Sequence, residues 1–478
     1  MLLQGALIVD GSGAPGWTGD LLMAGERIAA LGPRLDVDAA VPRRDCRGLV
    51  LAPGFIDAHS HDDAALLTTP AMTPKLTQGV TTVVTGNCGL SLAPLVTADP
   101  PPPLNLLARE HFRHASFAAW RAAVDAARPA VNAVGLVGHT ALRLRCLADL
   151  SRPATPAERG AMCALLDDAM REGAAGLSSG TFYAPAAAAD SEELLALARV
   201  AARHGGVYAV HLRDEMAGVL GAIAEAADCA HAAGLPLVIS HHKCAGRAQW
   251  GRSLQTLALI ERLSQRQALG LDVYPYLAGS TVLREDLADG ATPIRLTWSE
   301  AHPELAGRWL ADIARDWGCS EPAAVARLQP GGACYFQMCD ADVDRILTHP
   351  LAMIGSDGLP HDRFPHPRLW GAFPRVWAHY GRERGLLTLE TAVHKMTGLT
   401  AQRFGLRDRG LLRAGAAADL VLFDADTLAD RADYGQPSEP ATGIAAVWVN
   451  GALALDGGAP GARAGRVLGR VQGLRGGE

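Results

Sequence analysis

Histidine and aspartate side chains stand at the ends of several short apolar runs in this chain. His59 and His61 end the first run. Residues i and i+2 of an extended strand point the same way, so both imidazoles can face one metal ion. His211, His241 and Asp357 end three later runs, and polar residues follow each of them. Four histidines and an aspartate converging on one face are difficult to explain as core filling, so the pattern predicts a metal site.

Cys88, in the segment TGNCG, ends the second run and is the remaining plausible anionic ligand. A carboxylated lysine can bridge two metal ions, but no lysine ends the third, fourth or fifth run. A cysteine at this position would bind zinc as a thiolate, at about 2.3 Å. One cysteine and two histidines form an open zinc site, because three protein ligands leave one position for chemistry.

Eight apolar runs that end in polar or glycine residues alternate with helical stretches along the middle of the chain. The runs cover residues 49–61, 81–89, 131–139, 173–180, 206–215, 236–243, 269–276 and 352–358. Eight such β-α units predict an α/β fold of the (β/α)8 TIM-like barrel type, whose active residues lie at the C-terminal ends of the strands. The segment between the last two runs is far longer than one crossover helix needs. The extra residues, about 281–340, predict an inserted subdomain after strand 7, near the barrel mouth.

Both ends of the chain alternate short apolar runs with turns, a pattern typical of strands and hairpins. Neither end can bury a core alone, so we expect the two to pair into one small β-sandwich. The expected domains are therefore a sandwich from residues 1–52 and 410–478, and a metal-dependent barrel over 53–409 that carries the insert.

The whole-chain properties exclude several classes of protein. The net charge of −6 over 478 residues gives no reason to expect nucleic acid as a partner. No apolar run approaches the ~20 residues of a membrane span, and the start lacks the features of a signal peptide. Nine scattered cysteines without a CxxC pair indicate mostly free thiols in a reducing cytoplasm. The oligomeric state stays open.

Longer motifs give a specific resemblance. The segments PGFIDAHSHDD, TTVVTGNCGLSLAP, SSGTFYAP, HLRDE, ISHHK, DVYPY, IGSDGLP, HPRLWGAFPRV and MTGLTAQRFGL are similar to those of the N-acyl-D-amino-acid deacylases (D-aminoacylases) of the amidohydrolase superfamily. The resemblance covers nearly the full chain. It implies a zinc-dependent hydrolase that cleaves a small-molecule N-acyl-D-amino acid to a carboxylate and a free D-amino acid.

The resemblance also implies roles at the predicted metal site. Cys88, His211 and His241 match a tightly bound zinc. A second, weaker metal position, often unoccupied, matches His59 and His61 with Asp357. Asp357 also matches the catalytic general base and acid, and a carboxylate there can take a proton from water and deliver it to the leaving amine.

A further set of residues matches the groups that hold the substrate carboxylate: Lys243, Tyr274, Ser280 and Arg368. A free carboxylate in a dry pocket needs cationic and hydroxyl donors. Arg368 offers a bidentate fork and Lys243 a point charge. Lys243 gains weight because the chain has only three lysines, and this one lies two residues after a predicted ligand.

Two alternative functions compete with this interpretation. A cyclic-amide hydrolase of the dihydropyrimidinase or hydantoinase type normally needs the bridging lysine, and it gives no reason for the pair Lys243 and Arg368. A non-catalytic scaffold of the same fold typically loses metal ligands, whereas the full set is present here.

The side chain of the substrate amino acid is less determined. An acidic side chain would need an additional basic partner, for which Arg284 is the nearest candidate. The apolar residues around it favour an apolar side chain: Val282, Leu283, Leu287, Leu359 and Phe364.

Overall fold

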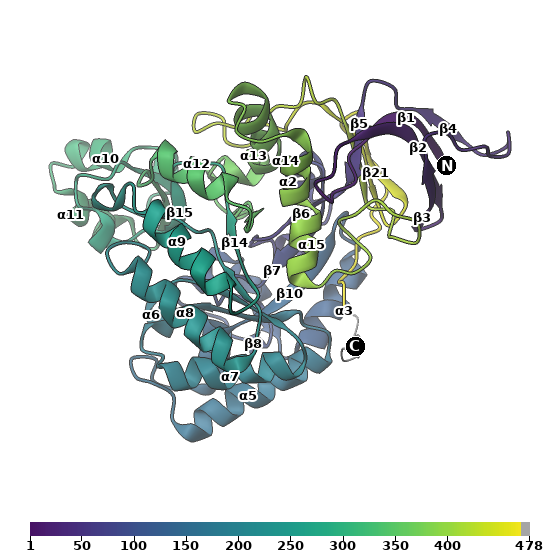
Figure 1. Ribbon diagram of the computed structural model, residues 1–478. Coiled ribbons are helices and arrows are strands. Elements are labelled where there is room, and N and C mark those ends of the chain that lie inside the picture. Colours follow the sequence, from purple (N-terminus) through teal and green to yellow (C-terminus); the bar gives the residue numbers. More distant parts are fainter. Residues whose placement is uncertain (470–478) are drawn as a thin grey trace.

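The chain folds around a barrel of parallel strands (Figure 1). The computed structural model describes residues 1–469. Eight strands pair in the order β18-β14-β13-β12-β11-β10-β7-β6. Their bounds are β6 Phe55–Asp57, β7 Val80–Thr85, β10 Asn132–Gly138, β11 Gly176–Gly180, β12 Val207–His211, β13 Leu237–Ile239, β14 Leu269–Val273 and β18 Ala352–Ile354. Every residue in these strands is buried, as expected for a parallel sheet covered by helices.

Backbone contacts bring the two edge strands together. The amide of Ala58 donates to the carbonyl of Ile354 at 3.1 Å, and Ser60 forms a parallel bridge with Gly358. The predicted (β/α)8 barrel is confirmed.

Helices connect the barrel strands and cover their outer face (Figure 1). They are α1 Ala65–Thr68, α2 Thr73–Leu76, α3 Phe117–Ala127, α4 His139–Cys146, α5 Pro156–Arg171, α6 Ala184–Ala187, α7 Ser191–Arg203, α8 Val219–Ala233, α9 Ser253–Ser264, α12 Asp340–Thr348, α13 Arg368–Arg375, α14 Leu389–Met396 and α15 Gly398–Phe404. Local signals start several of them. Thr155 and Glu158 form a capping box on α5, and the Asp190 side chain accepts from the Glu193 amide on α7.

A buried polar cluster connects helix α4, which follows β10, to helix α7, which follows β11. Glu193 on α7 accepts from both Nη1 of Arg143, at 2.7 Å, and Nε2 of His139, at 2.6 Å. All three side chains are inaccessible to solvent. Burial raises the pKa of Glu193, but the hydrogen bond from His139 leads the interactions that outweigh it and lower the pKa to about 2.

The two ends of the chain share one nine-stranded sheet, seen in Figure 1 as purple and yellow strands lying side by side. Its strands are β1 Leu2–Ile8, β2 Trp17–Ala24, β3 Arg27–Gly32, β4 Arg43–Asp45, β5 Val50–Pro53, β19 Leu420–Phe423, β20 Ile444–Val449, β21 Ala452–Asp456 and β22 Ala459–Pro460. Strands β5 and β19 pair antiparallel and join the two ends. The domain boundaries stay predictions, and the last nine residues of the expected sandwich, 470–478, lie outside the described residues.

The first apolar run of the sequence serves both sheets. Residues 50–53 belong to the terminal sheet and residues 55–57 to the barrel. Gly54 lies between them, and a Cβ there would stand 2.2 Å from the Thr81 side chain. The terminal sheet is therefore held directly against the strand that leads to His59 and His61.

A small subdomain lies between β14 and β18. Its antiparallel strands β15 Gly279–Val282, β17 Gly331–Tyr335 and β16 Ile294–Ser299 pair in that order, beside helices α10 Leu310–Asp316 and α11 Glu321–Leu328. It has a hydrophobic cluster of its own. Strand β15 runs over the C-terminal ends of the barrel strands and supplies residues to the main pocket. Among residues 1–469, no helix has the length and apolar character needed to cross a membrane.

Candidate metal centre and active site

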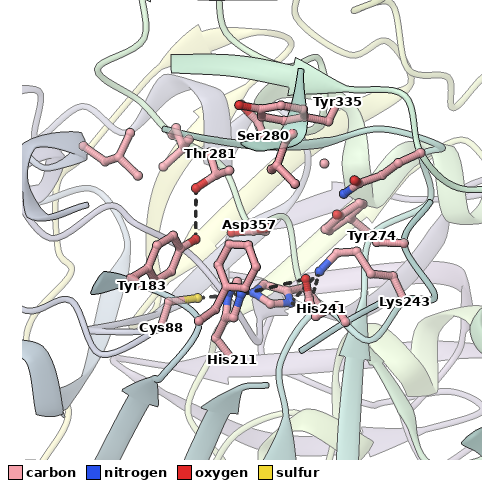
Figure 2. A pocket seen from close by; sticks show the side chains of 18 of the residues that line it. Cys88, Tyr183, His211, His241, Lys243, Tyr274, Ser280, Thr281, Tyr335 and Asp357 are labelled. Carbon is pink, nitrogen blue, oxygen red and sulfur yellow. Dashed lines mark hydrogen bonds and ion pairs between the residues drawn. The ribbon is translucent and has the colours of Figure 1, made fainter. Parts of the chain in front are cut away.

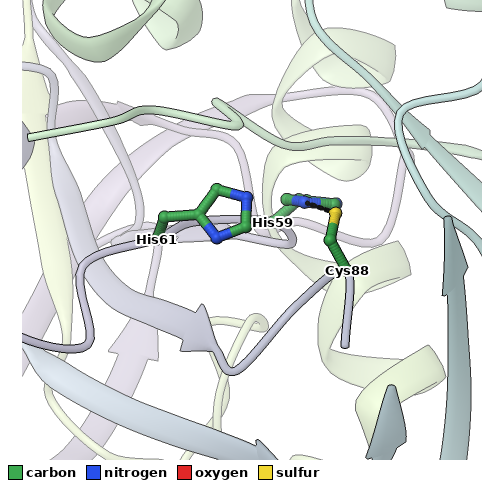
Figure 3. A group of neighbouring side chains, drawn as sticks. All are labelled: His59, His61 and Cys88. Carbon is green, nitrogen blue, oxygen red and sulfur yellow. Dashed lines mark hydrogen bonds between the residues drawn. The ribbon is translucent and has the colours of Figure 1, made fainter. Parts of the chain in front are cut away.

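The six predicted ligands lie together at the C-terminal ends of the barrel strands. Cys88 Sγ is 3.3 Å from Nε2 of His59 and 3.3 Å from Nε2 of His241 (Figures 2 and 3). Three groups of donor atoms lie within 4.8 Å of one another: His59, His61 and Cys88; Cys88, His211 and His241; and His59, His241 and Asp357. Ligands of a tetrahedral zinc ion lie about 3.3–3.8 Å apart, so the two separations from Cys88 are of the size that a shared metal ion requires.

Three of the site residues have an unusual backbone conformation. Cys88, His241 and Asp357 have positive φ angles of 55°, 35° and 49°, and only three other non-glycine residues in the described part of the chain do so. The left-handed region is costly for residues with a Cβ, and such strain clusters at functional sites. Each residue follows a barrel strand, so the sharp turn aims its side chain across the barrel mouth rather than outward.

Asp272, at the end of β14, fixes two of the ligands. Its Oδ1 accepts from the His241 amide at 2.9 Å, and its Oδ2 lies 3.4 Å from Nδ1 of His59. A carboxylate on Nδ1 leaves Nε2 of His59 free for a metal ion. Gly355 makes room for this contact, because a Cβ there would lie 2.6 Å from the His59 side chain and 2.8 Å from Asp272.

Electrostatics favour an anionic sulfur. Burial raises the pKa of Cys88, but the charges of His59 and His241 outweigh it and hold the pKa well below its usual value. Burial likewise raises the pKa of Asp357, and the charges of Arg368 and His59 bring it well below its usual value. A thiolate and a carboxylate therefore face the cluster, as metal ligands must.

His211 gives an independent test of the fit. Its ring is buried, and within residues 1–469 neither Nδ1 nor Nε2 has a hydrogen-bond partner, although Nε2 lies 3.8 Å from Oε2 of Glu215. Phe182 and Tyr183 pack against the ring, with centroids 5.3 and 4.9 Å away. A buried polar atom without a hydrogen bond is costly, and a metal ion bound beside Cys88 would satisfy one of the two ring nitrogens.

The four predicted carboxylate-holding residues lie beside the metal ligands. Arg368 is fully buried, its Nη1 is 2.9 Å from Asp357 Oδ2, and its guanidinium carbon lies 4.6 Å from the Tyr274 ring centre. Its Nη2 donates to the carbonyl of Ser280 at 3.1 Å. Lys243 Nζ contacts Glu215 Oε1 at 2.6 Å instead of standing free.

Several polar atoms of this group have no partner among the described residues. They are the Tyr274 hydroxyl, the Ser280 hydroxyl and Nε of Arg368, all of them buried. Burial raises the pKa of Tyr274 well above its usual value, so the phenol keeps its proton as a donor. Hydroxyl and guanidinium donors without partners fit an anionic oxygen group.

The structure adds residues that the sequence analysis did not single out. Glu215 Oε1 lies 3.1 Å from Nδ1 of His241 and also contacts Lys243, and Asp272 holds His59. Tyr183 lines the pocket and hydrogen-bonds Thr281 at 2.9 Å (Figure 2). Glu215 stands four residues after a predicted ligand, which is a weak signal for a supporting carboxylate.

Arg284 lies away from the main pocket. Its Nη2 pairs with Asp286 at 2.6 Å, and it lines a neighbouring cavity. The main cavity, of about 50 Å³, includes Leu287, Tyr335 and Leu359 in its lining.

An eight-stranded barrel with thiolate, imidazole and carboxylate donors grouped at its strand ends is the architecture of the metal-dependent hydrolases. The model of the amidohydrolase family matches residues 44–274 and 309–454. The chain belongs to the amidohydrolase family and, within it, to the N-acyl-D-amino-acid deacylases.

Three relatives support that placement. A D-aminoacylase of Alcaligenes xylosoxydans xylosoxydans is 52% identical over 473 residues, 98% of each chain. A solved D-aminoacylase structure, described as having a binuclear metal centre, has 51% identity and a TM-score of 0.95, covering 98% of this chain and 99% of the other. An N-acyl-D-glutamate deacylase of Bordetella bronchiseptica, complexed with zinc and a phosphonate inhibitor, has 45% identity and a TM-score of 0.94 over the same shares.

A dihydropyrimidinase of Brevibacillus agri is a more distant match. It has 17% identity and a TM-score of 0.63 over 99% of each chain. At this identity the likeness shows the fold alone.

Proposed function

We propose that the chain hydrolyses the amide bond of N-acyl-D-amino acids to give a carboxylate and a free D-amino acid. One observation carries the proposal: the metal-ligand cluster and a set of buried donors without partners meet at Asp357. Asp357 Oδ1 lies 3.2 Å from Nε2 of His61, and its Oδ2 lies 2.9 Å from Nη1 of Arg368.

That arrangement matches the short separation between the amide and the carboxylate of the substrate. A single carbon separates the amide nitrogen of an N-acyl amino acid from its carboxylate. A carboxylate bound by Arg368, Tyr274 and Ser280 therefore places the amide nitrogen next to Asp357. Lys243, beside Tyr274 in the same pocket, adds positive charge to this anchor.

Asp357 is the proposed general base and acid. It is ionised, so it can take a proton from the attacking water, and its position beside the carboxylate anchor lets it deliver that proton to the leaving amine. The cluster would hold a metal ion, and such an ion would supply a water of lowered pKa and polarise the acyl carbonyl. Tyr183 keeps its proton, because burial and the nearby Cys88 charge raise its pKa well above the usual value, and it is available as a donor in the pocket.

We infer that the ion is zinc, held tightly by Cys88, His211 and His241, since one thiolate and two imidazoles are a typical open zinc set. His59 and His61 with Asp357 form the weaker second position. All nine cysteines are free, which supports a reducing, cytoplasmic location.

The test is release of amine from N-acetyl-D-leucine by the zinc-loaded protein. We expect hydrolysis that a chelator abolishes, that zinc restores, and that exceeds hydrolysis of N-acetyl-L-leucine. Dihydrouracil is the matched cyclic amide without a free carboxylate. Hydrolysis of dihydrouracil without hydrolysis of N-acetyl-D-leucine would contradict the proposal and favour the cyclic-amide alternative.

A further inference from the structure

A second, larger cavity adjoins the active site. It has a volume of about 400 Å³, against about 50 Å³ for the active-site cavity. Phe182 and Tyr183 line both, so the two cavities share a wall. The smaller cavity lies at the proposed reacting groups, whereas the larger is of the size that binds small organic molecules.

The walls of the second cavity combine apolar side chains with neutral polar ones. The apolar residues are Pro102, Pro103, Ala184, Ala187, Val282 and Leu283, and Asn105 and Gln329 supply neutral amide groups. Among its described lining residues only Arg284 carries a charge, and that charge is paired with Asp286 at 2.6 Å. The Arg284 guanidinium lies 4.4 Å from the Phe182 ring centre and is stacked on that ring. These surfaces suit an uncharged, apolar ligand better than an anion.

The cavity lies on the acyl side of the proposed reaction centre. Figure 2 shows Tyr183 and Cys88 on one side of the pocket, and Lys243 and Tyr274 on the other. With the substrate carboxylate at Tyr274, the acyl chain leaves the scissile carbonyl in the opposite direction, toward Tyr183.

A single hydrogen bond marks the boundary between the cavities. The Tyr183 hydroxyl and Thr281 Oγ1 are 2.9 Å apart and connect the loop after β11 to strand β15 (Figure 2). Thr281 lines the active-site cavity and its neighbour Val282 lines the second cavity.

We propose that the second cavity is a subsite for the distal part of the acyl group, and that this chain favours N-acyl-D-amino acids with medium-length alkanoyl chains over N-acetyl substrates. The inference rests on the proposed hydrolysis and extends it to the acyl half of the substrate. Each methylene group that is buried in the cavity should raise kcat/KM by up to about fourfold.

The test compares N-acetyl-, N-butanoyl-, N-hexanoyl- and N-octanoyl-D-leucine with the zinc-loaded protein. We expect the octanoyl substrate to exceed the acetyl substrate in kcat/KM by at least about tenfold. Ala187 lines the cavity and is exposed, so Ala187→Trp fills the subsite at a position that tolerates a larger side chain. This variant should bring the octanoyl-to-acetyl ratio down to about one.

Ala188→Trp is the matched control, because Ala188 is the next residue and does not line the cavity. It should keep the ratio of the unaltered protein. Equal kcat/KM for all four substrates would overturn the acyl subsite alone, as would an unchanged ratio in Ala187→Trp. A preference for N-succinyl- over N-hexanoyl-D-leucine would overturn its apolar character. Failure to cleave any of the D-substrates would instead overturn the proposed hydrolysis.

Discussion

Replacing Asp357 with asparagine tests the proton-transfer role directly. The φ angle of 49° at this position strains most side chains, but asparagine tolerates it, so the backbone turn should survive. The side-chain oxygen of asparagine can keep its place beside Arg368, whose Nη1 lies 2.9 Å from Oδ2 of Asp357. What the variant removes is the negative charge and the basic oxygen. General acid–base catalysis contributes about 10²- to 10⁴-fold, so kcat should fall by that factor, or about 3–5 kcal/mol in the barrier.

The assay combines amine release from N-acetyl-D-leucine with metal analysis of the same preparation. The proposed tight site uses Cys88, His211 and His241 and not Asp357, so we expect about one zinc per chain to remain. Asp168→Asn is a control for charge removal, since Asp168 is an exposed residue paired with Arg171 on helix α5. A kcat within about threefold of the unaltered protein, at unchanged zinc content, would refute the proton-transfer role.

Three further predictions concern binding and stability. Arg368→Ala should raise KM for N-acetyl-D-leucine roughly 10- to 150-fold, from loss of charge-assisted hydrogen bonds; steady-state kinetics with unchanged KM would remove Arg368 from the carboxylate anchor. Lys75→Met leaves the buried carboxylates of Asp57 and Asp62 without their cation and should lower the free energy of unfolding in urea by about 3–5 kcal/mol. The control Arg44→Met breaks the exposed ion pair with Asp456 and should lower it by under about 1 kcal/mol. Equal losses in the two variants would contradict the prediction. Because the pKa of Glu193 is lowered from 4.5 to about 2, its stabilisation is present at neutral pH and is lost as the pH falls from about 4.5 toward 2. The stability difference between the unaltered protein and Glu193→Gln, followed by urea unfolding at several pH values, should therefore shrink over that range. A constant difference would show that the fold does not lower the pKa of Glu193.

Much of the barrel could be predicted because its signals are local. His59 and His61 share a strand face through their spacing of two, and the eight buried runs match parallel strands that are apolar on both faces. The first run misled in one respect. Residues 49–61 look like one strand, but Gly54 divides them between two sheets. Periodicity cannot locate such a division, since both halves are buried and apolar.

Other parts of the site depend on contacts between distant segments. Asp272 holds His59 from a strand more than two hundred residues away, and nothing in its neighbourhood distinguishes it from an ordinary strand residue. Arg284 shows the converse. Its place after the seventh run suggested a role in the main pocket. In the structure it pairs with Asp286, two residues further along the chain, and lines the neighbouring cavity. Side-chain direction at a loop is set by packing that a single sequence does not encode locally.

Lysine usage connects the sequence to the site more directly. The chain has three lysines against 41 arginines, and all three are buried, with exposed fractions of 0%, 5% and 2% for Lys75, Lys243 and Lys395. Lysine is rarely buried without a partner, and each has one: Lys75 contacts Asp57 and Ser356, each at 2.8 Å, Lys243 contacts a carboxylate and an imidazole, and Lys395 donates to backbone carbonyls. A compact ammonium with three donors suits such a small group of acceptors, whereas a planar guanidinium has a different shape and donor geometry. Because this chain uses arginine for most of its positive charges, its three lysines mark positions that favour a compact ammonium group. Two of them lie near the predicted metal ligands: Lys243 contacts His241, and Lys75 contacts Ser356, the residue before Asp357.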